Sequence, residues 1–472
     1  MRYNMEIKLR FLGAVRNVTG SRHMLEANDV RLLVDCGLYQ ERHFSDRNWD
    51  PFPVEPSSIN AVLLTHAHLD HCGLLPKLVK EGFRGRIYCT GATTEIAKII
   101  LLDSAHLQEE DAEYKKKRHK KQGRISPHPY EPLYTTEDAE ACFPHFESVS
   151  YREVVEFGNG VEATFYDAGH VLGSAIIRVK VQQNGQERII IFSGDIGRPD
   201  KPIVCDPTVF DEADYVLIES TYGDRVHEQT VDVKKKIGNT INAAAKAGGK
   251  IIVPSFALER SQEVLYYLNE LLLEEAIPNI KVYLDSPMAS RITKVFQRHP
   301  EMFDEEMTEL IENHESPFKF PELKIVGTTA ESKSINDKSG TFMVIAGSGM
   351  CTGGRVKHHL VNYISDHKNT IMFVGYQAIG TLGRRIVNGE KQVRIFGEER
   401  DVRANIVRIH GFSAHADRDE LLNWLRALKK APKKVFVVHG EEKSAKSFGD
   451  YVRKQTGWDT VVPAYQDEVI VD

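Results

Sequence analysis

Four side chains of metal-ligand type follow one short apolar run, and this cluster constrains the fold more than any other feature of the sequence. The stretch LLTHAHLDHCG places His66, His68, Asp70 and His71 directly after a predicted strand over residues 61–65. Side chains two residues apart on an extended chain project to the same face, so His66 and His68 can share one ion. If the chain then turns into a helix, Asp70 and His71 can point together at a second ion.

Side chains of the same kind stand at other predicted strand ends and turns. They are Asp35, His170, Asp195, Glu219 and His439, together with His415 just before a predicted helix. Ligand sites in α/β proteins form where the carboxyl ends of strands converge. The sequence therefore predicts one active site that gathers these residues. Neutral imidazoles and carboxylates suit zinc, or alternatively manganese.

Short apolar runs alternate with amphipathic ones along the whole chain. The predicted strands cover residues 7–12, 31–35, 61–65, 86–90, 163–167, 175–181, 188–192, 215–219, 250–253, 281–284, 341–346, 370–374, 402–409 and 433–438. The predicted helices cover residues 93–111, 231–246, 261–274, 355–365, 417–428 and 443–455. Alternation of this kind is typical of an α/β protein with covered sheets.

Length and composition narrow the class of protein. A chain of 472 residues suggests about two to four domains. The net charge of −6 argues against binding nucleic acid by bulk charge, although a local basic groove remains compatible with it. No apolar run approaches the length of a membrane span, and the N-terminus has no apolar signal core. The six cysteines are too widely spaced for a zinc module or a compact disulfide framework, which favours a reducing cytoplasm.

The H-x-H-x-D-H cluster, with the later His, Asp and His, resembles the metallo-β-lactamase superfamily. Glu219, His415 in SAHAD and His439 in VHGE resemble its β-CASP branch of nucleic-acid hydrolases, which includes the endonuclease subunit of eukaryotic pre-mRNA 3′-end processing and stand-alone prokaryotic relatives. The resemblance implies an αββα sandwich that carries an inserted α/β domain. The expected divisions are 1–205 and 397–472 for the sandwich and 206–396 for the insertion, which would cover the metal site as a lid and leave a groove.

The resemblance also implies a role for each candidate residue. One zinc would be held by His66, His68 and His170, and a second by Asp70, His71 and His439, with Asp195 bridging both. Asp35 would orient the H-x-H-x-D-H loop through hydrogen bonds. Glu219 would orient His415, which would lie near the scissile phosphate and serve as general acid.

The activity implied is that of a zinc-dependent ribonuclease with two Zn²⁺ ions. It would cleave single-stranded RNA to 5′-phosphate and 3′-hydroxyl ends, as an endonuclease or also as a 5′–3′ exonuclease. A DNA-processing nuclease is disfavoured because His439 is present, and a small-molecule hydrolase because of the long insertion. A scaffold subunit that has lost its ligands is disfavoured because none is missing. The sequence leaves a homodimer open and indicates no obligate protein partner.

Three segments are candidates for binding RNA phosphates. The loop AGSGMCTGGR contains Ser348, Gly349 and Arg355, and the loop GYQAIGTLGRR contains Thr381, Arg384 and Arg385. Gly-rich backbone before a helix offers N–H groups to an anion. The third segment is the basic run YKKKRHKKQGR over residues 114–124, which includes Lys115, Lys116 and Lys117. That run is either a rim for a phosphate chain or a solvated helix end.

Overall fold

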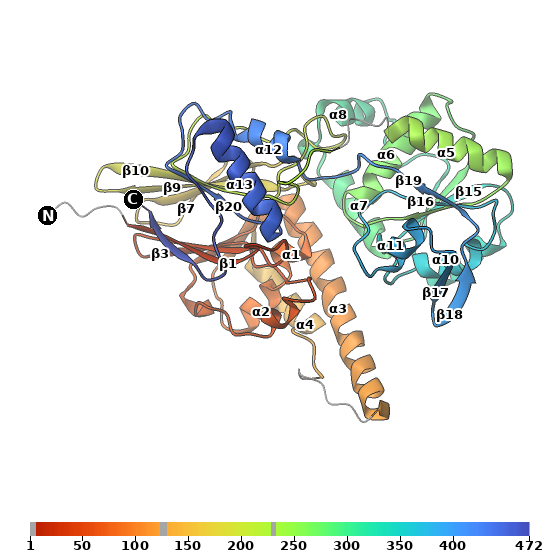
Figure 1. The fold of residues 1–472 in the computed structure, drawn as a ribbon, viewed down its shortest axis with the longest axis horizontal. Helices are drawn as coiled ribbons and strands as arrows, with labels where there is room; N and C mark the ends of the chain where they lie inside the picture. Colours follow the sequence, from red (N-terminus) through yellow and green to blue (C-terminus); the bar gives the residue numbers. More distant parts are fainter. Residues whose placement is uncertain (1–5, 123–129, 228–232, 472) are drawn as a thin grey trace. The chain divides into compact units, whose positions relative to one another are not determined.

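The computed structural model describes residues 6–122, 130–227 and 233–471 (Figure 1). They separate into two compact units, and each has its own sheets and core. The first unit contains Met1–Lys201, Asp206–Val226 and Ala414–Asp472, and the second contains Pro202–Cys205 and His227–Ser413.

Two seven-stranded sheets form the first unit in the part of the chain that is described. The first sheet has the order β22 (Glu468–Val471), β1 (Ile7–Gly13), β2 (Arg22–Ala27), β3 (Val30–Val34), β4 (Ala61–Leu63), β5 (Arg86–Thr90) and β6 (Phe146–Val149). The second has the order β21 (Thr460–Val461), β20 (Lys434–Val437), β11 (Tyr215–Ile218), β10 (Gln186–Phe192), β9 (Ala175–Gln183), β8 (Val161–Asp167) and β7 (Val154–Glu156).

The two sheets enclose a core of alternating apolar side chains. Leu9 and Leu25 of the first sheet join Phe165, Val179 and Phe436 of the second in one buried cluster. Residues that alternate along each strand face this core, which is why the two sheets pack face to face. The outer face of the second sheet is covered by α12 (Arg418–Leu425) and α13 (Glu442–Thr456), and that of the first by α1 (Leu69–Cys72), α2 (Leu75–Lys80), α3 (Gly91–Gln122) and α4 (Thr136–Cys142) (Figure 1).

A parallel sheet forms the centre of the second unit. Its order is β14 (Leu323–Ile325), β13 (Lys281–Leu284), β15 (Phe342–Ala346), β12 (Ile251–Pro254), β16 (Thr370–Phe373) and β19 (Asn405–Arg408), with a separate hairpin of β17 (Gln392–Ile395) and β18 (Glu398–Asp401). The helices are α5 (Val233–Ala247), α6 (Arg260–Leu273), α7 (Pro287–Arg298), α8 (Glu305–Glu312), α9 (Thr329–Ser334), α10 (Val356–Tyr363) and α11 (Leu382–Val387). Apolar side chains of α10 and α11 pack with those of β15 and β16.

The observed division of the chain differs from the expected one at both ends of the insertion. Residues 206–226 belong to the sandwich, because β11 pairs with β10 and β20 in its second sheet. Residues 397–413 belong to the inserted unit, because β19 pairs with β16. The strand pairings therefore move the boundaries from 206–396 to 227–413, with the short segment Pro202–Cys205 added.

Two further expectations concern the membrane and the cysteines. Among the described residues, no helix is long and apolar enough to cross a membrane, and this includes the charged 32-residue α3. None of the six cysteines, all of which lie in the described part of the chain, forms a disulfide bond, and five of them are buried.

Candidate metal centre

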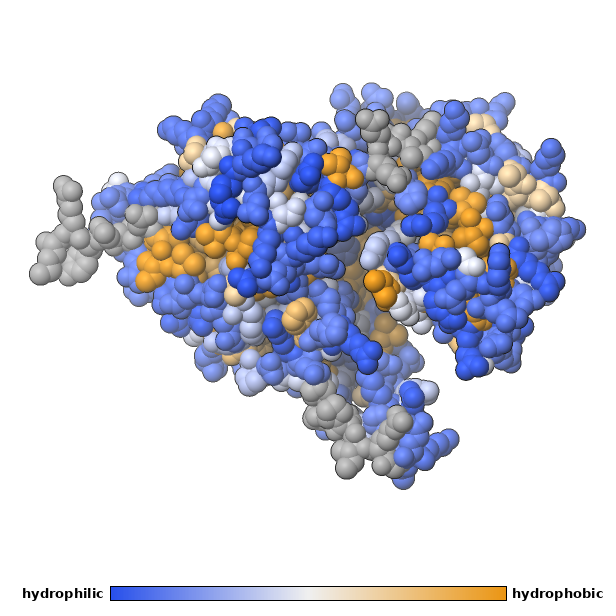
Figure 2. All heavy atoms as spheres, viewed as in Figure 1, coloured by the Kyte–Doolittle hydropathy of each residue, from blue (hydrophilic) through white to orange (hydrophobic). Residues whose placement is uncertain are grey.

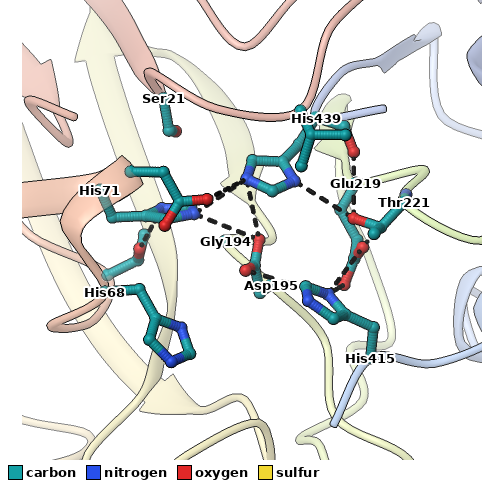
Figure 3. A network of polar contacts seen from close by, with 12 residues as sticks. Ser21, His68, His71, Gly194, Asp195, Glu219, Thr221, His415 and His439 are labelled. Atoms are coloured by element: carbon teal, nitrogen blue, oxygen red, sulfur yellow. Dashed lines mark hydrogen bonds and ion pairs between the residues drawn. The ribbon is translucent and has the colours of Figure 1, made fainter. Parts of the chain in front are cut away.

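The predicted site residues lie together at one edge of the sandwich (Figure 3). Each follows a strand or opens a short helix: Asp35 follows β3, His66 and His68 follow β4, Asp70 and His71 lie on α1, His170 follows β8, Asp195 follows β10, Glu219 follows β11, His439 follows β20, and His415 precedes α12. The carboxyl ends of neighbouring strands meet at a common edge, so residues far apart in sequence converge there.

The first ligand group is His66, His68, His170 and Asp195. Nε2 of His66 lies 3.0 Å from Nδ1 of His68, and Nε2 of His170 lies 3.4 Å from the same atom. Oδ2 of Asp195 lies 3.5 Å from Nε2 of His66 and 3.6 Å from Nε2 of His170. Four potential ligand atoms therefore face one point, and the expectation that His66 and His68 can share an ion agrees with this geometry.

The second ligand group is Asp70, His71 and His439. Nε2 of His71 lies 3.0 Å from Nε2 of His439, and Oδ2 of Asp70 lies 3.6 Å from the latter atom. Oδ1 of Asp195 lies 3.4 Å from Nε2 of His71 and 3.5 Å from Nε2 of His439. Asp195 thus turns one carboxylate oxygen toward each group, as a bridging ligand would.

These distances fit metal ions of zinc size. Two atoms that each lie about 2.0–2.1 Å from a tetrahedral zinc are separated by about 3.3–3.4 Å. Oδ1 of Asp195 is buried and accepts no hydrogen bond from any described residue. A buried carboxylate oxygen without a donor is costly unless a cation satisfies it. The donor set, its spacing and this oxygen together fit two zinc ions, one in each group.

Asp35 fixes the orientation of the loop that carries the histidine ligands, residues 65–71, through hydrogen bonds. Its Oδ1 accepts hydrogen bonds from the backbone N–H of Thr65 at 2.8 Å and from the Thr65 hydroxyl at 2.9 Å. Its Oδ2 contacts Nδ1 of His71 at 2.7 Å and accepts a hydrogen bond from Ser21 at 3.0 Å. Because Nδ1 of His71 is engaged in this way, its Nε2 is left to face the second group.

Two site residues adopt left-handed backbone conformations that favour glycine. Asp35 has φ 61° and His439 has φ 48°, each close after the end of a strand. Such a conformation costs a non-glycine residue about 1–2 kcal/mol. The side chains at these two positions therefore have a use that outweighs the backbone strain, which agrees with a functional site.

Burial favours neutral imidazoles in the first group. It is the largest cause that lowers the pKa of His66 and of His170 well below the usual value, and it lowers the pKa of His68 to about 4. A neutral imidazole has a lone pair to offer, so these three rings are in the form that binds a metal.

Carboxylates favour positive charge in the second group. Burial alone would lower the pKa of His71, but Asp195 and Asp35 outweigh it and raise that pKa well above its usual value. Burial is likewise outweighed at His439, whose pKa is raised by Asp195 and Asp70. Anionic side chains therefore make this half of the site attractive to cations.

His415 and Glu219 form a pair beside the first group. Both carboxylate oxygens of Glu219 lie 3.2 Å from Nδ1 of His415 (Figure 3). Glu219 is itself fixed, because Oε1 accepts a hydrogen bond from the N–H of Ile196 at 2.7 Å. Burial would lower the pKa of His415, but Glu219 and Asp195 raise it to about 9.

The two Gly-rich loops contact each other in the second unit, but several of their predicted RNA-binding side chains are engaged within the protein. The hydroxyl of Ser348 accepts hydrogen bonds from backbone N–H groups of its own loop. Arg355 donates to the buried Asp285 at 2.6 Å, and Arg385 pairs with Glu390. These contacts indicate structural roles.

The remaining candidates for RNA binding in these loops are Thr381, Gly349 and Arg384, and two of the three are engaged within the protein. The hydroxyl of Thr381 caps α11 by accepting from the N–H of Arg384. The carbonyl of Gly349 accepts a hydrogen bond from Gln377 of the other loop at 2.9 Å. Only the side chain of Arg384 makes no hydrogen bond or ion pair with any described residue, so it is the arginine of these loops that remains available to an anion.

Lys115, Lys116 and Lys117 lie on the last turns of α3 in the first unit. Lys115 and Lys117 pair with acids one helical turn earlier, Asp111 and Glu113. These exposed pairs agree with a solvated helix end, and Lys116 is exposed without such a pair among the residues that the structure describes. The surface toward the end of α3 is predominantly hydrophilic (Figure 2). Arg124, the end of the basic run, is outside the described residues.

Sequence reasoning missed three hydroxyl side chains around the ligands. Thr65 contacts Asp35 and lies 3.1 Å from Nδ1 of His66, and the hydroxyl of Thr221 lies 3.2 Å from Nδ1 of His439. Ser21 donates to Asp35. Only the position of Thr65, immediately before the histidine cluster, gives any signal of such a role.

Models of three protein families match the chain. A metallo-beta-lactamase superfamily domain matches residues 24–194, the Beta-Casp domain matches 261–386, and a Zn-dependent metallo-hydrolase RNA specificity domain matches 399–463. The matches cover segments of both units.

Relatives of known name match nearly the whole chain. The ribonuclease TTHA0252 of Thermus thermophilus is 39% identical over 93% of this chain and 94% of its own length. The transcription termination factor FttA of Methanocaldococcus jannaschii is 33% identical over 98% of this chain and 72% of its own length. A solved structure of a protein of unknown function from Enterococcus faecalis V583 has a TM-score of 0.57 at 12% identity, covering 99% of this chain and 100% of that one, which is a likeness of fold.

Proposed function

Because the chain belongs to the metallo-β-lactamase superfamily and contains a β-CASP domain, we propose that this metal-dependent hydrolase is a zinc-dependent ribonuclease. The substrate is RNA, and the reaction is hydrolysis. A phosphodiester bond of single-stranded RNA is hydrolysed to leave a 5′-phosphate and a 3′-hydroxyl. Cleavage within the strand is the main mode, and 5′–3′ exonuclease activity is a second mode.

The observation that carries this proposal is the position of Asp195 between the two ligand groups. Its two oxygens face different histidine sets, at 3.4–3.6 Å from their Nε2 atoms. Two zinc ions bound there would lower the pKa of a water between them and bind the phosphoryl oxygens. The chain's part is to hold the ligands in fixed orientation, which Asp35 does for the histidine loop through its contacts with Thr65 and His71.

His415 is the residue that donates a proton to the leaving group. The oxygen of water bonds to phosphorus, the bond from phosphorus to the ribose O3′ breaks, and O3′ then takes up a proton. Because Glu219 faces Nδ1 of His415, the Nε2–H of that ring is the proton that can be donated. The pKa of about 9 keeps the ring protonated near neutral pH, as a general acid requires.

Two features support RNA over the alternatives. The chain carries the RNA specificity domain and resembles a named ribonuclease along nearly its entire length. His439, which DNA-processing relatives tend to lack, is present and contacts His71. The inserted unit of the β-CASP type argues against a compact small-molecule substrate.

The metal count and the compartment belong to the same proposal. We assign two Zn²⁺ ions per chain, with Mn²⁺ as an alternative, because Asp195 turns a different carboxylate oxygen toward each ligand group. The six free cysteines, five of them buried, are consistent with the reducing cytoplasm.

The test is cleavage of matched RNA and DNA strands of one sequence, labelled either at the 5′ end or internally. We expect RNA cleavage that stops with a chelator and returns with zinc, and products that a 5′-phosphate-specific exonuclease degrades. Release of mononucleotides from the 5′ end identifies the exonuclease mode. Preferential cleavage of DNA, or RNA cleavage that is insensitive to the chelator, contradicts the proposal.

A double variant tests the ligand assignment directly. His66→Ala with His68→Ala removes two of four ligands from the first group, so we expect cleavage to fall below detection and bound zinc to fall. Zinc per chain is measured by elemental analysis. Replacing the exposed surface residue His106, also by Ala, is the matched control and leaves both quantities unchanged. Full zinc content in the double variant contradicts the assignment.

A further inference from the structure

Three neighbouring parallel strands of the second unit end in adjacent loops, and two of these loops carry an exposed aromatic side chain. Phe256 follows β12, the Gly-rich segment from Gly347 follows β15, and Gly375 and Tyr376 follow β16. The chain leaves β12 for β13 on one side of the sheet and leaves β16 for β19 on the other side. Open α/β sheets bind their ligands at the carboxyl edge, at the point where the connections of neighbouring strands diverge in this way.

Phe256 is held in place by glycines of both loops. A Cβ atom at Gly349 would lie 2.7 Å from the Phe256 ring, and one at Gly375 would lie 3.1 Å from it, so the ring rests against backbone on that side. Gln377 ties the two loops together, because Nε2 donates to the carbonyls of Gly349 and Gly375 at 2.9 and 3.2 Å. The ring is thus fixed in advance of any ligand, which reduces the entropy lost on binding.

The aromatic faces on this edge are open. Phe256 is 38% exposed and Tyr376 is 60% exposed, and neither makes a ring contact with another aromatic side chain of the described residues. Ile379, three residues after Tyr376, is 87% exposed. In this unit, apolar surface interrupts an otherwise hydrophilic face (Figure 2).

The charge of the loops suits a polyanion that offers flat rings. Residues 347–354 and 374–383 contain no Asp or Glu, and Arg384 follows directly. The absence of carboxylates from these two loops removes a source of repulsion of phosphates, and the aromatic faces can stack on bases of any sequence. A single strand of RNA has both features, whereas the two Gly-rich loops offer an acidic or basic protein segment no ion pair except at Arg384.

We propose that Phe256 and Tyr376 form a stacking surface for nucleobases of the RNA substrate. The inference rests on the proposed function for its choice of RNA, and it adds binding residues of the second unit, none of which belongs to the ligand groups. Stacking contributes affinity without sequence preference, because every base presents a π face. The site therefore accounts for retention of RNA by a chain whose net charge is −6.

The first test uses Tyr376→Ala and Phe256→Leu, with Tyr376→Phe and Ile379→Ala as matched controls in the full chain. We expect KM for single-stranded RNA to rise about tenfold in each of the first two variants, with kcat unchanged. Tyr376→Phe retains the ring and Ile379→Ala removes only an aliphatic group, so both keep the original KM. Zinc content and thermal midpoint are measured for every variant to show that the fold is intact.

The second test separates stacking from other interactions. RNA strands that lack one base, scanned along the sequence, are cleaved by the original chain and by Tyr376→Ala. At the stacked position, the increase in KM caused by removing the base and the increase caused by removing the ring should not add, because both changes abolish the same interaction. Additive effects at every position overturn the inference.

Different experimental results would contradict the stacking surface and the proposed function. If the unaltered chain neither binds nor cleaves RNA, the proposed function fails. If it cleaves RNA with chelator sensitivity while both aromatic variants keep their KM, only the stacking surface fails, and the aromatic edge is then a surface for a protein partner.

Discussion

At the scale of single residues, His415 meets the carboxylate of Glu219 through one of its ring nitrogens, Nδ1. Glu219 faces Nδ1 with both oxygens, and the same histidine lies 3.9 Å from Asp195. His415 is not one of the four residues of the first group, although it forms a third cluster of potential ligands with Asp195 and Glu219. Its part in cleavage can therefore be separated from metal binding.

We predict that His415→Ala lowers kcat by about 10²–10⁴-fold, the usual contribution of a general acid, while zinc content stays normal. Steady-state kinetics and elemental analysis measure the two quantities. Asp195→Asn is the comparison variant, and it should lose zinc together with activity because it removes charge shared by both groups. A large loss of zinc in His415→Ala would instead make that residue a ligand.

At the scale of elements, the last residue of β8, Asp167, has a buried carboxyl group that the fold keeps protonated to a higher pH than usual. Burial raises the pKa of Asp167 to about 7, against a smaller lowering effect of the Gly169 N–H that it accepts. The folded state thus binds this proton more tightly than the unfolded state does. Stability from this group is fully present below about pH 4 and is lost as the pH rises to about 7.

We predict that Asp167→Asn removes this dependence, because the amide keeps an acceptor for Gly169 and carries no charge. The free energy of unfolding of the variant, relative to the original chain, should be higher at pH 8 than at pH 5. Urea unfolding at both pH values measures the difference. Asp29→Asn, in an exposed turn, is the control and should show no such change; an equal change in both variants contradicts the prediction.

The last turns of α3 form the second element with a testable role. Replacing Lys115, Lys116 and Lys117 by Gln removes three positive charges from an exposed helix end. If this end binds phosphates, KM for RNA rises and the slope of affinity against salt concentration becomes shallower, by about one unit for each phosphate that is no longer bound. Three exposed lysines of α13, Lys443, Lys446 and Lys454, replaced in the same way, are the control. An unchanged salt slope assigns the run to a solvated helix end.

Prediction of elements from sequence succeeded where periodicity was strong. The expected helices over 231–246 and 443–455 agree with α5 and α13, whose apolar positions recur at helical spacing. Elements such as α9 and β14 have six and three residues, too few for a period to stand out, and they were missed. The helix expected over 93–111 continues to Gln122, because the charged run 114–122 has high helix propensity despite its lack of an apolar face.

At the scale of the whole molecule, the chain has two units with separate cores, and the ligand groups lie in only one of them. Metal binding stabilises whichever folded unit contains the site, because the unfolded chain does not hold the ligands together. The second unit has its own parallel sheet and buried cluster.

We predict that a chelator lowers the midpoint of one thermal transition and leaves a second transition in place. Differential scanning calorimetry with and without zinc measures both. Asp195→Asn should remove the zinc-dependent shift, which serves as the control. A shift of equal size in both transitions would contradict the assignment of the metals to the sandwich alone.

The sequence by itself determined the kind of chemistry and most of the residues that face it. Ligand chemistry is local, since a histidine cluster after an apolar strand can be recognised without knowledge of its neighbours. Only the tertiary structure decided the partners of those residues. Thr65, Thr221 and Ser21 contact the site through hydrogen bonds whose partners are set by chain folding, and of the three only Thr65 has a sequence position that signals such a role.

The same distinction holds for the loops and the boundaries. The Gly-rich segments were visible in the sequence, but the pairing of Arg355 with Asp285 and the seat of Phe256 against Gly349 depend on which strands are neighbours in the sheet. Strand order joins residues separated by tens to hundreds of positions, and local pattern does not encode it. For this reason residues that lie together as candidate ligands could be named from sequence, whereas the ends of the inserted unit and its aromatic edge could not.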